Sequence, residues 1–175
     1  MTDLVRGLQR GEPGAWDEAW AAWRVRILGF LLRMCRDRAV AEELCQDTFL
    51  ALAQHGPRLR DDTDLGAWLY TVARNRYRSW RRWAWLDARR LVALAQRPAL
   101  PGPDPHQHAV GGETLRRLEA AIAGLPEGQR EVFLLVAVDQ LDQAAAAVVL
   151  GISPETLRQR LSRARAAIGR ALETP

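Results

Sequence analysis

Arginines interleaved with aromatic rings fill one stretch of the chain, and this combination could bind a nucleic-acid strand. Seven arginines and a single acid, Asp87, lie between Arg74 and Arg90, and four of the seven tryptophans fall within 68–85. Arginine cations can follow phosphates while exposed rings stack on unpaired bases. The alternative is a core helix whose arginines extend past the apolar surface to reach solvent. Other parts of the chain must therefore decide between these two interpretations.

The rings of this stretch cannot all lie on one face of a helix. Helical spacing places four apolar residues toward a core, namely Trp68, Leu69, Val72 and Trp80. Either Tyr77 or Trp83 is then expected to remain partly outside.

The segment 142–171 has the pattern of a helix-turn-helix. Gly151 can adopt the left-handed conformation that ends a helix. Ser153 and Pro154 suit the cap and first position of the next helix. Its inward face, at steps of four, three and four, carries Leu157, Leu161, Ala164 and Ile168. Its outward face carries side chains that can contact base edges or phosphates: Arg158, Gln159, Ser162, Arg163 and Arg165. A solvated amphipathic helix is the alternative.

Acidic residues are concentrated elsewhere. Glu42, Glu43 and Asp47 fall on an expected helix over 39–54, and three aspartates lie between 61 and 64. An acidic helix suggests a protein partner with basic contacts, although a solvated face would look the same.

The 175 residues are organised as two helical blocks, and the expected fold is all-α. Helices are expected over 2–10, 15–36, 39–54, 65–90, 115–125, 127–138, 142–150 and 154–171. A linker rich in proline and glycine over 98–112 separates a domain at 1–97 from a second at 113–175, and we expect this linker to be flexible.

Several functional classes are not expected. No apolar run approaches the ~20 residues of a membrane helix, and the N-terminus lacks a secretion signal, which favours the cytoplasm. Cys35 and Cys45 form no disulfide framework. His106 and His108 have weak metal spacing. We expect no catalytic constellation, metal or cofactor. The net charge of +4 permits nucleic-acid binding without requiring it.

Together these motifs resemble one family, the extracytoplasmic-function (ECF) sigma factors of bacterial RNA polymerase. Five segments carry the resemblance in the family's order: 4–16, AEELCQDTFL at 41–50, AWLYTVARN at 67–75, LPEGQREVFL at 125–134, and LGIS at 150–153 with LRQRLSRAR at 157–165.

The resemblance implies the partners and the residues that contact them. The partners would be the clamp helices of the polymerase core, promoter DNA and an anti-sigma factor. The polymerase contacts would be Glu42, Leu44, Gln46, Asp47, Phe49 and Leu50. The minus-ten element would be read by Asn75, Arg76, Trp80 and Arg82 together with the loop 56–64. The minus-thirty-five element would be read by Thr156, Arg158, Gln159, Ser162, Arg163 and Arg165.

Two positions depart from the family pattern. Ser79 stands where the family usually has an acid, and the first helix of the helix-turn-helix, which usually reads like YEEIAEIL, is QAAAAVVL over 143–150. This almost wholly apolar helix exposes surface that could require a partner. Two other functions therefore stay open: a stand-alone helix-turn-helix regulator and a sigma-like adaptor for protein interactions.

Overall fold

The computed structural model describes the backbone of residues 2–94 and 112–173 and the side chains of 3–85 and 112–173. Every element in these ranges is helical, so the predicted all-α fold is confirmed there. The expected linker at 98–112 lies outside the described residues except for Gly112, which precedes the fifth α-helix. None of the described helices is both long and apolar enough to span a bilayer.

The first half of the chain forms a bundle of four α-helices, here called the N-terminal bundle. Its elements are α1 (Thr2–Gln9), α2 (Pro13–Cys35), α3 (Arg38–His55), the short 3-10 helix η1 (Gly56–Arg58) and α4 (Leu65–Leu94). Aliphatic and aromatic side chains from all four α-helices are fully buried in its core, among them Leu8, Phe30, Leu52 and Tyr70. Burial of these faces drives the bundle together, since each helix alone would leave an apolar stripe in water.

Local signals fix where the helices of this bundle begin and how closely they approach. Asp37 caps α3, because its side chain accepts a hydrogen bond from the Val40 amide at 3.0 Å. Gly66 on α4 lies directly against the Trp23 ring of α2, and a Cβ at this position would overlap the ring. The bundle therefore requires glycine where α2 and α4 cross.

The second half forms the C-terminal bundle. Its elements are α5 (Glu113–Gly124), α6 (Glu127–Phe133), the π-helical turn η3 (Leu134–Val138), α7 (Gln143–Leu150) and α8 (Pro154–Glu173). The η3 turn closes with a 2.8 Å hydrogen bond from the Asp139 amide to the Leu134 carbonyl. This wider turn ends the α6–η3 rod and directs the chain into α7.

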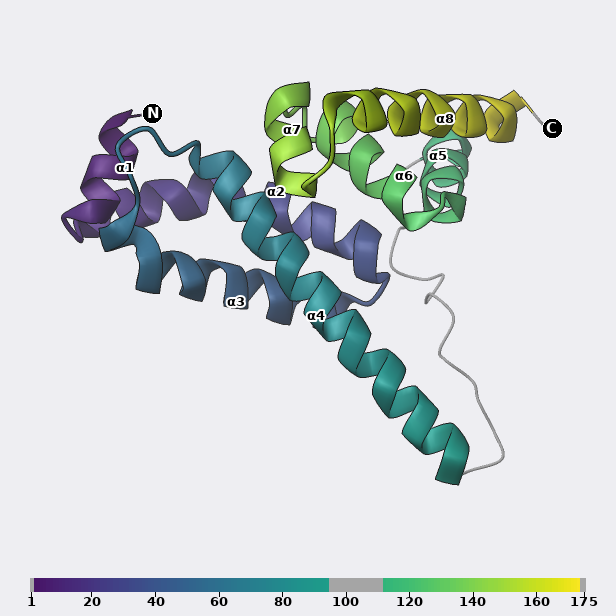
Figure 1. The fold of residues 1–175 in the computed structure, drawn as a ribbon, viewed down its shortest axis with the longest axis horizontal. Helices are drawn as coiled ribbons and strands as arrows, with labels where there is room; N and C mark the ends of the chain where they lie inside the picture. Colours follow the sequence, from purple (N-terminus) through teal and green to yellow (C-terminus); the bar gives the residue numbers. More distant parts are fainter. Residues whose placement is uncertain (1, 95–111, 174–175) are drawn as a thin grey trace.

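The two bundles pack directly against each other (Figure 1). Helix α4 lies against α7, and α2 lies against α6. The buried side chains of both halves form one continuous apolar cluster. The C-terminal end of α4 extends away from this contact and from the rest of the molecule. The surface shared by the two bundles is called the seam below.

Candidate nucleic-acid interface

The start of α8 is built as the sequence predicts. Gly151 has φ of 62°, which is left-handed, and ends α7. The Ser153 hydroxyl accepts a hydrogen bond from the Thr156 amide at 3.1 Å and thereby caps α8. Pro154 is the first residue of that helix. The turn therefore orients α8 rigidly relative to α7.

The two faces of α8 also agree with the prediction. The predicted inward residues, from Leu157 to Ile168, are all buried. Arg158, Arg163 and Arg165 are exposed, and their guanidinium groups have no ion-pair or hydrogen-bond partner within the described ranges. Gln159 is exposed and lies 3.4 Å from the Glu155 carboxylate. The two remaining predicted contacts to the minus-thirty-five element differ in exposure. Ser162 is exposed, whereas Thr156 is half-buried beside the Ser153 cap. This face thus presents unpaired cations to solvent.

The arginine-rich part of α4 carries a second basic surface. An open groove of about 920 Å³ is lined by Asn75, Arg78, Ser79, Arg81, Arg82 and Trp85. The predicted minus-ten residues Asn75, Arg76 and Arg82 are exposed. Two of them, Asn75 and Arg82, line this groove, whereas Arg76 does not. The groove combines cations with an aromatic ring, as binding of a nucleic-acid strand requires.

The rings of α4 divide between core and solvent. Tyr77 is buried and packs beside Trp80, with 6.1 Å between the ring centroids. Trp80 and Trp68 are half-buried and pack against the core, and Leu69 is fully buried. Val72 is half-buried. The sequence left open whether Tyr77 or Trp83 would remain outside the core. It is Trp83 that does so, with 58% of the residue exposed. A base could stack on Trp83 without repacking of the core.

The loop that precedes α4 is held by α1. The Gln9 amide donates to the Leu59 carbonyl at 2.6 Å and to the Asp61 carboxylate at 2.9 Å. Asp64 caps α4 by accepting from the Ala67 amide at 3.0 Å. The third acid of this loop, Asp62, accepts two hydrogen bonds from the Arg60 guanidinium at 3.0 Å. All three acids therefore have structural contacts, and those of Asp61 and Asp64 fix the loop beside the N-terminus of α4.

A third exposed surface lies on α3 and combines apolar and acidic side chains. Trp20 of α2 and Phe49 meet edge to face with 4.7 Å between centroids, and Leu50 is 57% exposed. Gln46 is exposed and Asp47 is half-buried, whereas Glu42 forms an ion pair with Arg38 at 2.8 Å. The prediction for Leu44 needs correction, because this side chain is buried in the core and cannot contact a partner in this structure.

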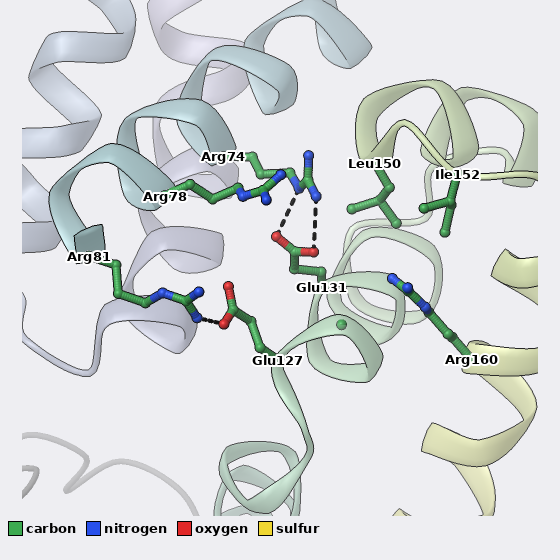
Figure 2. A pocket seen from close by; sticks show the side chains of 9 residues that line it. Arg74, Arg78, Arg81, Glu127, Glu131, Leu150, Ile152 and Arg160 are labelled. Carbon is green, nitrogen blue, oxygen red and sulfur yellow. Dashed lines mark hydrogen bonds and ion pairs between the residues drawn. The ribbon is translucent and has the colours of Figure 1, made fainter. Parts of the chain in front are cut away.

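The sequence did not predict the ion pairs across the seam (Figure 2). Arg74 of α4 faces Glu131 of α6, with Nε to Oε1 at 2.8 Å and Nη2 to Oε2 at 3.3 Å. Arg81, two turns later on α4, pairs with Glu127. A cavity of about 340 Å³ lies beside these pairs. The available signal was the pair of arginines seven residues apart, which share one helix face.

No group of three or more His, Cys, Asp or Glu side chains in the described ranges is placed to hold a metal ion. His106 and His108 lie outside those ranges. Burial raises the pKa of the Cys45 thiol to about 11 and that of the Cys35 thiol to about 12. Neither thiol is therefore an activated nucleophile.

Known proteins match both bundles. A Sigma-70 region 2 model matches residues 19–86, and a Sigma-70, region 4 model matches residues 115–168. The chain is 32% identical over 158 residues to the RNA polymerase sigma factor CarQ of Myxococcus xanthus, with 87% of this chain and 86% of CarQ covered. It is 30% identical over 148 residues to the probable RNA polymerase sigma factor RfaY of Xanthomonas campestris pv. campestris, covering 81% of this chain but only 36% of RfaY.

A solved structure shares the fold. The sigma factor RpoE in complex with the anti-sigma factor NepR, from Bartonella quintana, aligns with a TM-score of 0.75 and 22% identity over 90% of this chain and 96% of that chain. The region 2 match covers the groove of α4, and the region 4 match covers most of α8. The chain thus belongs to the sigma-70 family of RNA polymerase sigma factors, in its extracytoplasmic-function group, and serves in transcription initiation.

Proposed function

We propose that this sigma factor reads a promoter with two separate surfaces while a third surface holds the polymerase. Residues 1–97 would bind the core enzyme and the minus-ten element, 98–112 would link the domains, and 113–175 would bind the minus-thirty-five element. The observation that carries this proposal is the outward face of α8, where Arg158, Arg163 and Arg165 are exposed and lack partners among the described residues. Unpaired guanidinium groups on a rigidly capped helix suit phosphates and guanine edges.

The minus-ten role is supported by the groove on α4. Extruding a base from the duplex costs a few kcal/mol, and stacking on an aromatic ring contributes about 1–3 kcal/mol per base. Trp83 offers an exposed ring, and Arg82 in the neighbouring groove offers a cation for the phosphates. The free energy gained when the protein binds the separated strand can therefore offset the cost of melting the duplex. In this proposal the protein acts by binding the melted strand more tightly than the duplex, with no catalytic step.

The polymerase-binding role is supported by the surface around Phe49. The exposed apolar side chains Trp20 and Leu50 provide area to bury, and Asp47 provides a charge for basic contacts. We retain Glu42, Gln46, Asp47, Phe49 and Leu50 as polymerase contacts and assign Leu44 to the packing that positions them.

We further propose that the protein acts in the cytoplasm, where the polymerase works, and that an anti-sigma factor controls it. The solved relative RpoE is bound to the anti-sigma factor NepR, which motivates this extension.

Run-off transcription with purified core polymerase tests the function. The full chain is expected to direct initiation from a promoter that core alone does not use. The double variant Arg158→Ala/Arg163→Ala should lose most of this activity. Arg116→Ala is the matched control, because this exposed arginine pairs with Glu113 on α5. No promoter-dependent transcript with the wild-type chain, or equal loss in the control, would contradict the proposal.

A further inference from the structure

Two arginines that line the cavity at the seam have no charged partner. Arg78 is exposed on α4 and Arg160 is half-buried on α8, and neither forms a hydrogen bond or an ion pair with another described residue. Figure 2 shows their side chains reaching into this space from two different helices, with Glu131 between them in that view. Neither arginine is among the promoter contacts that the sequence predicts, so the proposed function leaves both without a role.

The cavity carries an excess of positive charge. Its lining holds four arginines and two glutamates, and both glutamates are already neutralised, Glu131 by Arg74 and Glu127 by Arg81. Glu131 is only 4% exposed and both of its carboxylate oxygens face Arg74, so it presents little negative charge to the cavity. The two unpaired guanidinium groups therefore remain uncompensated. Like charges that converge without a counter-ion repel each other, and an anion between them removes this repulsion.

Gly128 on α6 sets the position of the Arg160 side chain. A Cβ at residue 128 would lie 3.0 Å from Arg160 Nη1 and 3.4 Å from its Cζ, so the guanidinium rests against α6 where glycine leaves room for it. Leu150 at the end of α7 and Ile152 in the turn that follows also line the cavity. A planar guanidinium held in this way loses less conformational entropy when it binds a ligand.

The chemistry of this cavity fits a diphosphate group. A guanidinium binds a phosphoryl group through two parallel N–H···O bonds, and two guanidinium groups can bind two linked phosphoryl groups. The volume of about 340 Å³ is at the lower end of the ~300–1,000 Å³ range of small-molecule sites. None of the nine residues that line it within the described ranges has an aromatic ring for a base to stack on. The anion is thus the part of a ligand that these residues recognise.

We propose that the cavity between Arg78 and Arg160 is a binding site for a small diphosphate anion, either inorganic pyrophosphate or the diphosphate of a nucleotide. Each of the two arginines binds one phosphoryl group. Because one lies on α4 and the other on α8, the bound anion contacts both bundles at once. The ligand binds the folded chain and not the unfolded one, so it also raises Tm as its concentration exceeds the dissociation constant.

Isothermal titration calorimetry of the full chain with inorganic pyrophosphate tests the site, at constant ionic strength and without magnesium. Arg160→Gln keeps most of the side-chain length and removes the charge, and it should weaken binding by about tenfold to 100-fold. Arg78→Gln should act in the same direction, but Arg160 is the sharper probe because Arg78 also lines the groove of α4. Arg116→Gln is the matched control, since this exposed arginine of α5 does not line the cavity. No binding by wild type, equal loss in the control, or unchanged affinity in both cavity variants overturns the proposal.

Gly128→Ala tests the position of the Arg160 guanidinium without changing any charge. The added Cβ displaces the guanidinium, so affinity for pyrophosphate should fall severalfold. Alanine favours a helix more than glycine does, so Tm measured without pyrophosphate should not fall. Wild-type affinity in this variant overturns the assigned role of Arg160.

Three further probes identify what the cavity binds. Equal affinity for ADP and pyrophosphate supports recognition of the diphosphate alone, and tighter binding of ADP assigns the site to nucleotides. Sulfate that binds as tightly as pyrophosphate shows that charge alone is recognised and overturns the diphosphate. If wild type ignores pyrophosphate while both cavity variants bind a short DNA duplex more weakly, the arginines contact the DNA backbone and the proposal is wrong. Each of these outcomes leaves the test of the proposed function by run-off transcription unaffected.

Discussion

Tyr70 and Asp139 meet inside the seam, one from α4 and the other from the end of η3. The Tyr70 hydroxyl and Asp139 Oδ2 are both buried, and neither has a hydrogen-bond partner of good geometry among the described residues. Burial raises the pKa of Asp139 from its ordinary 3.8 to about 6, although Tyr70, Arg26 and Arg33 partly oppose this rise. Asp139 therefore binds a proton more readily in the folded protein than in the unfolded chain.

This raised pKa predicts a specific pH dependence. The folded protein binds the extra proton, so the contribution of protonated Asp139 to stability is complete below about pH 4 and is lost as the pH rises through about 6. Asn is neutral at all pH values, so Asp139→Asn removes the cost of a buried charge at neutral pH. The variant should therefore have a higher Tm at that pH, and its free energy of unfolding should rise by on the order of 1–2 kcal/mol after allowance for solvent screening. Calorimetry near pH 5 and pH 7.5 measures this. A gain in Tm that is the same at both values would contradict the assignment.

Trp83 and Trp80 should respond differently to removal of the ring. Trp83→Ala removes an exposed ring, so single-strand binding should weaken by about 1–3 kcal/mol while Tm stays unchanged. Trp80→Ala removes a ring that packs on the core and should lower stability by about 2 kcal/mol. Fluorescence anisotropy with a labelled single strand and a melting curve separate the two effects. Unchanged strand affinity in the Trp83 variant would exclude this ring from the path of the strand.

Arg158 and Arg165 should differ on a promoter library. Arg158 lies in the first turns of α8, which reach deepest into a groove, so Arg158→Ala should cost about 1–3 kcal/mol at one base position. Arg165→Ala should weaken binding of all sequences equally and lower the salt slope by about one. The comparison is made with holoenzyme. Uniform weakening by both variants would mean that α8 holds only the backbone.

Asp47→Arg should weaken binding to core polymerase roughly tenfold, which corresponds to about 1.4 kcal/mol, because it reverses a charge beside the apolar surface of α3. The fold should persist, since this carboxylate has no partner among the described residues. A pull-down with core and a melting curve measure the two quantities. Asp3→Arg, an exposed change on α1, is the control and should leave affinity unchanged. Equal affinity of the two variants would remove Asp47 from the interface.

Gly66→Ala should destabilise the N-terminal bundle by about 1–3 kcal/mol, because the added Cβ overlaps the Trp23 ring and α2 and α4 must separate. Gly14→Ala is the matched control, since no atom lies within 4 Å of a Cβ built there. Denaturant unfolding compares the two. Equal midpoints would mean that the Trp23 ring can move aside without cost.

Local features of the fold could be predicted from the sequence. Gly151 adopts the left-handed conformation that ends α7, and the Ser153 hydroxyl caps α8, so these two residues define the turn between the helices. Apolar residues at steps of three and four along α8 distinguish its buried face from its exposed face. The burial of Leu44 agrees with its spacing, because Leu44, Thr48 and Leu52 follow one another at steps of four and all three are buried. Its assignment to the polymerase contacts came from the family resemblance, which covers a whole segment and does not separate the two faces of the helix. The bond between Arg74 and Glu131 joins residues 57 positions apart, and no local pattern links them.

Because both sides of the seam belong to one chain, closure is a unimolecular event. Joining two binding surfaces by a short stretch of chain gives an effective concentration in the millimolar range. Dilution of the sigma factor therefore does not separate the two bundles, because their contact does not depend on a second molecule. The packing of α4 against α7 is in this respect independent of how many copies of the sigma factor are made, unlike the contact between two subunits.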